Sequence, residues 1–340
     1  MSKWRTAIEA EFGSEVYQSR FMGEVISTGS FVLDYLLEIG GFPVGRLAEV
    51  FGEEGSGKTT TVLSCILECL KEGRAVLFED FEARLTDAVL IKMEIDPKKI
   101  ADYRVMPETM EDGWKIIQRF CERPEHKGGM IFVDSLAAMP AKVELEEGID
   151  GKERVGLIAR IMSRNLRQTT QKLAKANIGL VFVNQERASI DLKLGGGKTT
   201  PGGKALRFYS SMRVQLNLKG RLTHEQINDL TGQKEKIVTG VQVGLNVVKN
   251  SFGGSYRRGV MAIRMNGGID NIYSALKVGA FAGICEQKGS YYILPEEFAR
   301  KDDLGEVKKQ GYEQMRSFLT SNPEIWNKYM EAIKAFLNKK

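Results

Sequence analysis

Four short runs of hydrophobic residues recur along the first half of the chain. They lie at Leu47–Phe51, Ala75–Phe78, Met130–Val133 and Ile178–Val183. Such runs are typical of parallel strands that are buried on both faces. Stretches with helical spacing of apolar residues lie between them at Thr60–Leu70, Leu85–Met93, Met110–Cys121 and Glu153–Ala176. The alternation predicts a mostly parallel, doubly wound α/β sheet whose sites lie at the carboxyl ends of its strands.

The pattern changes after Gly203. Polar and apolar residues then alternate over three stretches, Met212–Leu218, Val238–Val248 and Val260–Met265. This alternation predicts antiparallel strands that extend the sheet. From Asn271 onward the spacing becomes helical again, and it ends in a predicted helix over Glu324–Lys340 with one apolar face. We therefore expect a small, α-rich C-terminal domain.

Composition excludes several classes of protein. A chain of 340 residues with 42% hydrophobic residues is large enough for about two globular domains. The formal net charge of +5 is small, so a nucleic-acid site requires a local concentration of cations. The four cysteines and two histidines lack the spacing of a metal cage. The sequence shows neither a secretion signal nor a membrane-spanning run, so we expect a cytoplasmic protein with no membrane partner.

The tripeptide Gly-Lys-Thr, which grips phosphates in P-loop proteins, occurs twice. In FGEEGSGKTT, Gly52, Gly57, Lys58 and Thr59 fit the spacing G-x-x-x-x-G-K-[ST] and lie between a predicted strand and a predicted helix. The second copy lies in LGGGKTTPGG, residues 194–203. The glycine required five positions before Gly197 is replaced by Leu192, and no helix can begin at the proline and glycines that follow the tripeptide. The first copy is therefore interpreted as the phosphate site and the second as a flexible loop.

Polar residues at the ends of three other strands complete a candidate phosphate-hydrolysis site. Asp134 follows MIFV and is expected to hold Mg²⁺ beside Thr59, on the assumption that the two strands are adjacent. Glu82 follows AVLFED-F and can orient or deprotonate a water molecule. Asn184 and Gln185 end VFVNQ, and their amides can bind a γ-phosphate.

These residues resemble those of the bacterial RecA recombinases. The stretches that carry the resemblance are ISTGSFVLDYLLEIGGFPVGRLAEVFGEEGSGKTT, FVDSLAAM, VGLIARIMSRNLRQ, VFVNQERASI, TTPGGKALRFYSSMR and VVKNS. The resemblance implies a RecA-type ATPase core over residues 26–268, a short oligomerisation segment over residues 1–25 and a C-terminal domain over residues 269–340. It also implies a helical homo-oligomeric filament on single-stranded DNA, which exchanges strands with homologous duplex DNA and hydrolyses ATP when bound to DNA.

The resemblance assigns roles around the nucleotide. ATP and Mg²⁺ are the implied cofactors, with Thr59 and Asp134 at the metal. The implied catalytic residues are Lys58, Glu82, Gln185 as the γ-phosphate switch, and Lys249 acting from the neighbouring protomer. The implied nucleotide contacts are Gly52, Glu53, Glu54, Gly55, Ser56, Gly57, Lys58, Thr59, Thr60 and Asp134.

The resemblance also places two DNA loops, at about Glu147–Gly156 and Glu186–Gly203. The second contains the other Gly-Lys-Thr. Arg160, Arg164 and Arg167 share one face of the helix after the first loop and suit a phosphate backbone. The other implied DNA contacts are Val155, Arg187, Ile190, Lys193, Lys198, Gly202 and Gly203. Phe208 is implied to transmit the nucleotide signal across the protomer interface.

Three departures from the family pattern concern function. Ser251 replaces a second lysine after Lys249, and a monovalent cation near Ser251, or Arg257 or Arg258, can supply the missing charge. Val89 replaces a tyrosine that stacks on adenine, and Thr86 replaces an acid beside it. The cations of the family's duplex site are replaced by Asn217, Leu218, Gly244 and Asn246, with Lys219 and Arg221 as candidate substitutes.

Three functions stay open on the sequence alone. The first is a DNA-dependent ATPase and recombinase, assisted by single-strand-binding and loader proteins and associated with the bacterial nucleoid. The second is a filament that binds ATP and coats or regulates DNA but exchanges strands poorly. The third is a ring-shaped ATPase with the same core, against which the long second loop argues.

Overall fold

The computed structural model describes residues 23–147, 156–188, 198–199, 201, 203–227, 232–299 and 305–338. An eight-stranded sheet forms the centre of the molecule, in the order β12-β11-β10-β3-β7-β6-β4-β5. Within the described ranges, no helix combines the length and the apolar character needed to cross a membrane.

The central part of the sheet is parallel. It consists of β3 (Leu47–Gly52), β4 (Val76–Asp80), β5 (Arg104–Val105), β6 (Met130–Asp134) and β7 (Gly179–Gln185). Four of these are the predicted hydrophobic runs, and the short edge strand β5 was not predicted. The parallel, doubly wound α/β core is thus confirmed. The expectation that the strands before Thr59 and Asp134 are adjacent is wrong, because β7 lies between β3 and β6. The hydrophobic pattern of a strand does not encode its neighbours.

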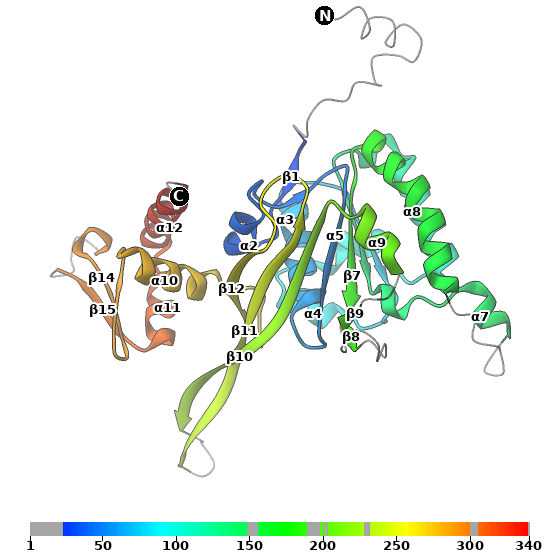
Figure 1. The fold of residues 1–340 in the computed structure, drawn as a ribbon. Helices are drawn as coiled ribbons and strands as arrows, with labels where there is room; N and C mark the ends of the chain where they lie inside the picture. The colour runs from blue at the N-terminus through cyan, green and yellow to red at the C-terminus, as the bar shows by residue number, and fades with distance from the viewer. Residues whose placement is uncertain are drawn as a thin grey trace, which may run out of the picture.

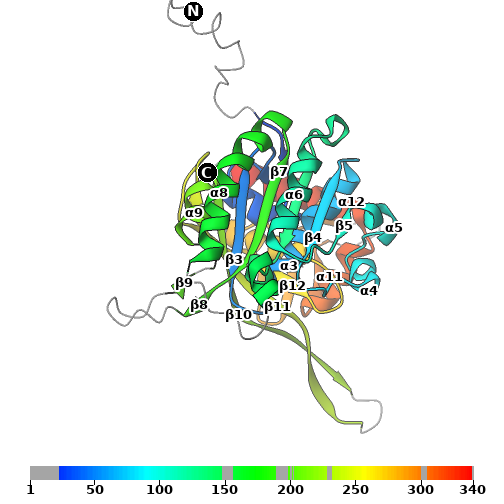
Figure 2. The same cartoon turned by 90° about the vertical axis from the view of Figure 1, so that its right-hand side faces the viewer.

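Helices cover both faces of the sheet. The first face packs against α2 (Phe31–Leu36), α3 (Lys58–Lys71) and α4 (Asp87–Lys92). The second packs against α6 (Met110–Cys121), α8 (Leu157–Ala176) and α9 (Gly203–Tyr209), which Figure 2 shows in front of the sheet. The smaller elements of the core are β1 (Val25–Ile26), β2 (Phe42–Pro43), α5 (Pro97–Ile100), α7 (Lys142–Glu147), β8 (Arg187–Ala188) and β9 (Lys198–Thr199).

Three further strands extend the sheet beyond β3. The first of them runs parallel to β3, and the three strands pair antiparallel with one another, as the alternation predicted. They are β10 (Met212–Ile227), β11 (Lys234–Asn250) and β12 (Arg257–Arg264). β10 pairs with β3 only through Leu216, and β12 pairs with β11 only as far as Gly240, yet β10 and β11 stay paired to Ile227 and Lys234. The two strands therefore project from the sheet as a two-stranded arm (Figure 1). Both are longer than predicted, because the polar arm lacks a hydrophobic pattern.

The C-terminal part forms its own core beyond the β12 edge of the sheet (Figure 1). It contains α10 (Asn271–Ala282), α11 (Tyr312–Thr320) and α12 (Pro323–Asn338). Between α10 and α11 the chain forms a three-stranded antiparallel sheet, made of β13 (Glu286–Lys288), β14 (Tyr291–Leu294) and β15 (Val307–Gln310). The C-terminal part is α-rich, as expected, but the small sheet was not predicted, because its strands are only three or four residues long. The division into three domains stays a prediction.

Glu79 on β4 is a carboxyl group in the hydrophobic core. Its side chain is fully buried, and neither carboxylate oxygen has a hydrogen-bond partner within the described part of the chain. Helix α6 packs closely against this carboxyl group, and a Cβ added to Gly113 would lie 2.9 Å from Glu79 Oε2. Burial raises the pKa of Glu79 well above its ordinary value of 4.5, since an apolar site disfavours the charged form.

We predict that Glu79→Gln stabilises the protein, and more so as pH rises. The folded state binds the Glu79 proton more tightly than the unfolded state, so wild-type stability falls with rising pH from about 4.5 up to the raised pKa. A glutamine has no such loss, so the stability of the variant relative to wild type should rise from pH 5 to pH 8, by up to about 1.4 kcal/mol in the free energy of unfolding for each pH unit below the raised pKa. Urea unfolding of both proteins at pH 5 and pH 8 measures the gain. A gain that is equal at both pH values contradicts the assignment.

Candidate active site

The phosphate loop connects β3 to α3. Gly57 caps the N-terminus of α3 in the left-handed conformation, with φ of 85°, and a Cβ on it would lie 2.2 Å from Ile263 Cδ1. Only glycine fits this position without strain or displacement of Ile263. Lys58 Nζ donates to the main-chain oxygens of Gly52, at 3.1 Å, and Glu53, at 2.7 Å. The lysine thus arches back over the loop, where a phosphate can replace the two carbonyl oxygens as its acceptor.

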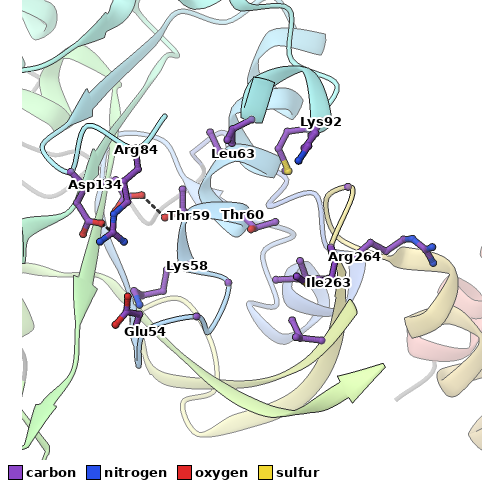
Figure 3. A pocket seen from close by; sticks show the side chains of 18 of the residues that line it. Glu54, Lys58, Thr59, Thr60, Leu63, Arg84, Lys92, Asp134, Ile263 and Arg264 are labelled. Carbon is purple, nitrogen blue, oxygen red and sulfur yellow. Dashed lines mark hydrogen bonds and ion pairs between the residues drawn. The ribbon is translucent and has the colours of Figure 1, made fainter. Parts of the chain in front are cut away.

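A cavity of about 540 Å³ opens beside this loop (Figure 3). Lys58, Thr59 and Asp134 lie at one end of it, and Arg264 lies toward the other (Figure 3). Apolar side chains also line the cavity, namely Leu63, Val89, Met93, Val241, Ile263 and Met265. A polyanion can therefore bind at the loop while a flat apolar group packs against the side chains beyond it. Val89 does lie in this wall, so the replacement of a stacking tyrosine concerns the cavity directly.

Thr59 and Asp134 meet although their strands are not neighbours. The Thr59 hydroxyl donates to Asp134 Oδ2 at 2.6 Å. Burial raises the pKa of Asp134 to about 6, and the nearby Glu82 and Asp80 carboxylates add to the rise, while the Thr59 hydrogen bond and Lys58 oppose it. Burial lowers the pKa of Lys58, against the opposing effect of the same acidic surroundings. The carboxyl and ammonium groups are thus both desolvated, which strengthens their interaction with a bound charge.

This pair fits a magnesium ion. A hydroxyl and a carboxylate are hard oxygen ligands, and Mg²⁺ bound with a nucleotide usually takes few protein ligands besides phosphate oxygens. Across the described residues, no cluster of three or more His, Cys, Asp or Glu side chains could hold a metal ion. Thr59 and Asp134 can therefore hold Mg²⁺ only together with the phosphates of a nucleotide.

Glu82 and Gln185 contact each other at the carboxyl end of the sheet. Gln185 Nε2 donates to Glu82 Oε1 at 3.2 Å, and Ser135 Oγ donates to the same oxygen at 2.5 Å. Arg84 Nη1 lies 3.0 Å from the other oxygen, Glu82 Oε2. Glu82 and Gln185 also line the cavity, so the predicted base and the predicted switch are joined beside the phosphate loop.

Asn184 has another role than expected. Its side chain is buried and is absent from the cavity lining. Asn184 Nδ2 donates to Glu49 Oε1 at 2.9 Å and to the main-chain oxygen of Pro201 at 3.0 Å. Glu49 in turn accepts from the buried Arg213 at 2.5 Å. The interpretation of Asn184 as a phosphate ligand is therefore wrong, because its amide already ties the far end of the segment 186–203 to the sheet.

Comparison with known proteins decides the family. The family described as the RecA N-terminal domain matches residues 6–270. The chain belongs to the RecA family. The protein named Protein RecA from Thermus aquaticus is 34% identical over 326 residues, which are 94% of this chain and 88% of that protein. Protein RecA from the Wolbachia pipientis strain of Culex pipiens is 35% identical over 303 residues, 89% of this chain and 78% of that protein.

A solved structure supports the RecA-type fold. The crystal structure of the RadB recombinase superposes with a TM-score of 0.51, and it covers 72% of this chain and 98% of its own. Its sequence is 20% identical, so the likeness concerns the fold alone. Membership of the RecA family supports a recombinase and ATPase role, with ATP and Mg²⁺ as the family's cofactors.

The residues matched to the RecA protomer interface lie away from the cavity. Phe208 on α9 is 77% exposed, so it is not a core residue in this chain. Lys249 on β11 donates to the main-chain oxygens of Arg207, at 3.1 Å, and Phe208, at 2.9 Å. Burial lowers the pKa of Lys249, and nearby Arg213 adds to the effect. Lys249 therefore caps the end of α9 in its own protomer.

The segments matched to the RecA DNA loops are described only in part. The first lies between α7, which ends at Glu147, and α8, which begins at Leu157. The second lies between β7 and α9, and its short strands β8 and β9 pair with each other. Arg160, Arg164 and Arg167 are exposed on α8. Val155, Ile190, Lys193 and Gly202 lie outside the described residues, and Arg187, Lys198 and Gly203 are described only as members of β8, β9 and α9.

Three of the four residues that replace cations of the RecA duplex site, all but Leu218, line a second cavity, also of about 540 Å³. It lies on β10, β11 and β12 and is lined by Asn217, Lys219, Gly244, Asn246 and Arg258, among others. A Cβ on Gly244 would lie 2.6 Å from Lys219 Cε, so glycine leaves room for the Lys219 side chain. Lys219 lies in this cavity, where it is a candidate substitute cation.

Arg257 is one of the residues that the sequence offered to replace the charge missing at Ser251. It is paired with Glu38 Oε1 at 2.5 Å and stacks on Tyr35.

Sequence reasoning missed several side chains of the site. Arg84, Lys92 and Arg264 line the nucleotide cavity, and Glu186 contributes to the charge around Lys58. Arg84 and Lys92 lie near the ends of a predicted strand and a predicted helix, but a single cation at such an end does not indicate a nucleotide site. Arg264 comes from β12, which the chain order does not place beside the phosphate loop.

Proposed function

We propose that the chain is an ATP-dependent homologous recombinase that assembles into helical filaments on single-stranded DNA. In this proposal ATP binds at the boundary between protomers, hydrolysis depends on DNA, and the filament exchanges strands with homologous duplex DNA. The observation that carries it is the Gln185–Glu82 hydrogen bond. It joins Glu82, beside the phosphate loop, to Gln185, the residue that directly precedes the segment 186–203, which is matched to a RecA DNA loop.

In this proposal the residues of the cavity have separate roles in binding and hydrolysing the triphosphate. Lys58 and the main-chain N–H groups of residues 52–60 bind the phosphates at the N-terminus of α3. Thr59 and Asp134 would hold Mg²⁺, which when bound neutralises charge on the phosphate oxygens. Glu82 orients the attacking water and accepts its proton, with Ser135 and Gln185 fixing its carboxylate.

Coupling to DNA requires that Gln185 bind differently in the two states. Without a triphosphate its amide donates to Glu82, and with one it turns to the γ-phosphate. The segment 186–203 follows Gln185 and is tied at its far end through Asn184 and Pro201. ATP can shift the equilibrium toward the DNA-binding arrangement only by the difference between its binding free energies for the two arrangements. Lys249 joins the neighbour's γ-phosphate only after leaving the carbonyls that end α9.

We predict that Gln185→Ala uncouples DNA from nucleotide. The variant keeps Lys58, Thr59 and Asp134, and it loses one hydrogen bond to a charged acceptor in each state, to Glu82 without the triphosphate and to the γ-phosphate with it. Because the two losses offset each other, its affinity for ATP should stay within about tenfold of wild type. The ratio of single-stranded DNA affinities with and without a non-hydrolysable ATP analogue should fall close to one. Fluorescence anisotropy with labelled DNA measures the ratio. A ratio equal to that of wild type contradicts the switch.

The second candidate is a DNA-coating or regulatory filament that exchanges strands poorly. The cavity on β10–β12 favours it, because Asn217, Gly244 and Asn246 stand where the family has cations. A strand-exchange assay with homologous duplex and purified protein separates the two. Joint molecules that form only with ATP and homology support the recombinase, and stable filaments without joint molecules support the alternative.

Single-strand-binding and loader proteins are proposed as assisting partners.

A further inference from the structure

Glu186 is a carboxylate at the start of the matched DNA loop that the hydrolysis of ATP does not use. It directly follows Gln185, and its main-chain N–H donates to the Gly52 oxygen at 3.1 Å. The same oxygen accepts from Lys58 Nζ. The backbone at Glu186 is therefore fixed to the first residue of the phosphate loop.

The Glu186 side chain reaches sideways to β10. Gln215 Nε2 donates to Glu186 Oε1 at 2.7 Å, and Asn246 Nδ2 donates to Gln215 Oε1 at 3.2 Å. In the sheet, Gln215 pairs with Phe51 on β3 and with Asn246 on β11. The three side chains thus form a continuous chain of hydrogen bonds from the end of β7 past β3 to β10 and β11, level with the phosphate loop. We name it the Glu186 clasp.

The clasp is built to hold one arrangement of Gln185. All three side chains are partly buried, where a hydrogen bond to a charged carboxylate is stronger than in water. Glu186 is fixed at both its main chain and its side chain, so the main chain of the adjacent Gln185, whose amide reaches Glu82 at 3.2 Å, is held as well. The Gln185 amide can rotate toward a phosphate, but any movement that carries the following segment with it must displace the Glu186 peptide and break the clasp.

We propose that Glu186 and Gln215 are positioning residues that hold the start of the segment 186–203 in its low-affinity arrangement when no triphosphate is bound. This inference rests on the proposed coupling of nucleotide to DNA. Breaking the clasp destabilises the resting arrangement alone, so it raises the DNA affinity of the nucleotide-free protein and leaves that of the ATP-bound protein unchanged. The expected rise is about tenfold, the effect of losing one hydrogen bond to a charged group.

Three variants test the clasp. Gln215→Glu places two carboxylates face to face and breaks it. Glu186→Gln keeps it, since a glutamine oxygen still accepts from Gln215. The double variant Glu186→Gln with Gln215→Glu restores it with donor and acceptor exchanged, and it has the net charge of wild type. Single-stranded DNA affinity is measured by anisotropy with no nucleotide, with ADP and with a non-hydrolysable ATP analogue.

The expected signs separate the clasp from simple charge repulsion. The clasp predicts that Gln215→Glu binds DNA about tenfold more tightly than wild type without nucleotide, and that the double variant returns to the wild-type value. Repulsion alone predicts the opposite, with weaker binding by Gln215→Glu and tighter binding by Glu186→Gln, and that result overturns the proposal. If Gln215→Glu does not fold, Gln215→Met, which has neither donor nor acceptor, carries the same expectation.

Failure of this inference is distinct from failure of the proposed function. Wild-type protein whose DNA affinity is independent of nucleotide contradicts the coupling itself. Wild-type protein that is coupled, together with a Gln215→Glu variant of unchanged nucleotide dependence, contradicts the clasp only.

Discussion

Replacing Glu82 with glutamine is expected to reduce DNA-stimulated ATP hydrolysis by about 10²- to 10⁴-fold, the usual contribution of a general base. Ser135 and Gln185 both donate to Glu82 Oε1, so the carboxylate is held at the cavity and its side chain is only 15% exposed. Glutamine has the same shape but cannot accept a proton. ATP binding should persist, and the variant should stay on DNA longer because the triphosphate is not consumed.

Phosphate release and nucleotide binding, measured separately, check this prediction. Glu125→Gln is the matched control, since Glu125 is an exposed carboxylate in a short 3₁₀ helix and does not line the cavity. Hydrolysis by the Glu82 variant within threefold of the control would remove Glu82 from the mechanism.

Replacing Lys58 with alanine should have an effect of similar size on binding itself. Lys58 is only 8% exposed, and its ammonium group donates to Gly52 and Glu53 where a phosphate can take over as acceptor. A desolvated cation aimed at phosphate is worth about 10²- to 10³-fold. We therefore expect ATP affinity and hydrolysis both to fall by at least about 10²-fold, and DNA affinity to lose its dependence on nucleotide.

Lys71→Ala is the control for this variant. Lys71 ends the same helix but is exposed and pairs with Glu68 at 2.8 Å, so its loss should leave ATP binding unchanged. Titration with a fluorescent ATP analogue measures both proteins. Equal affinities for the Lys58 and Lys71 variants would contradict the assignment of the phosphate loop.

The parts of the fold that the sequence predicts are those determined by local pattern. The hydrophobic runs and the G-x-x-x-x-G-K-[ST] spacing identify β3, β6, β7 and the phosphate loop, because buried strands and phosphate loops impose their own residue types. Strand order has no such signature. Thr59 and Asp134 were expected on neighbouring strands, and they meet across the intervening β7.

The remaining features depend on contacts between distant segments. Asn184 looked like a phosphate ligand until the structure placed Glu49 and Pro201 beside it. The bond from Gln215 to Glu186 joins residues 29 positions apart and has no motif. The three-stranded C-terminal sheet escaped prediction because strands such as Glu286–Lys288 are wholly exposed and lack alternation.

The central claim is that nucleotide at the phosphate loop controls how tightly the chain holds single-stranded DNA. The most direct measurement is the affinity of the wild-type protein for an unstructured oligonucleotide at one salt concentration, taken with no nucleotide, with ADP and with a non-hydrolysable ATP analogue. The account predicts the tightest binding with the analogue. Equal affinity in all three conditions would contradict it.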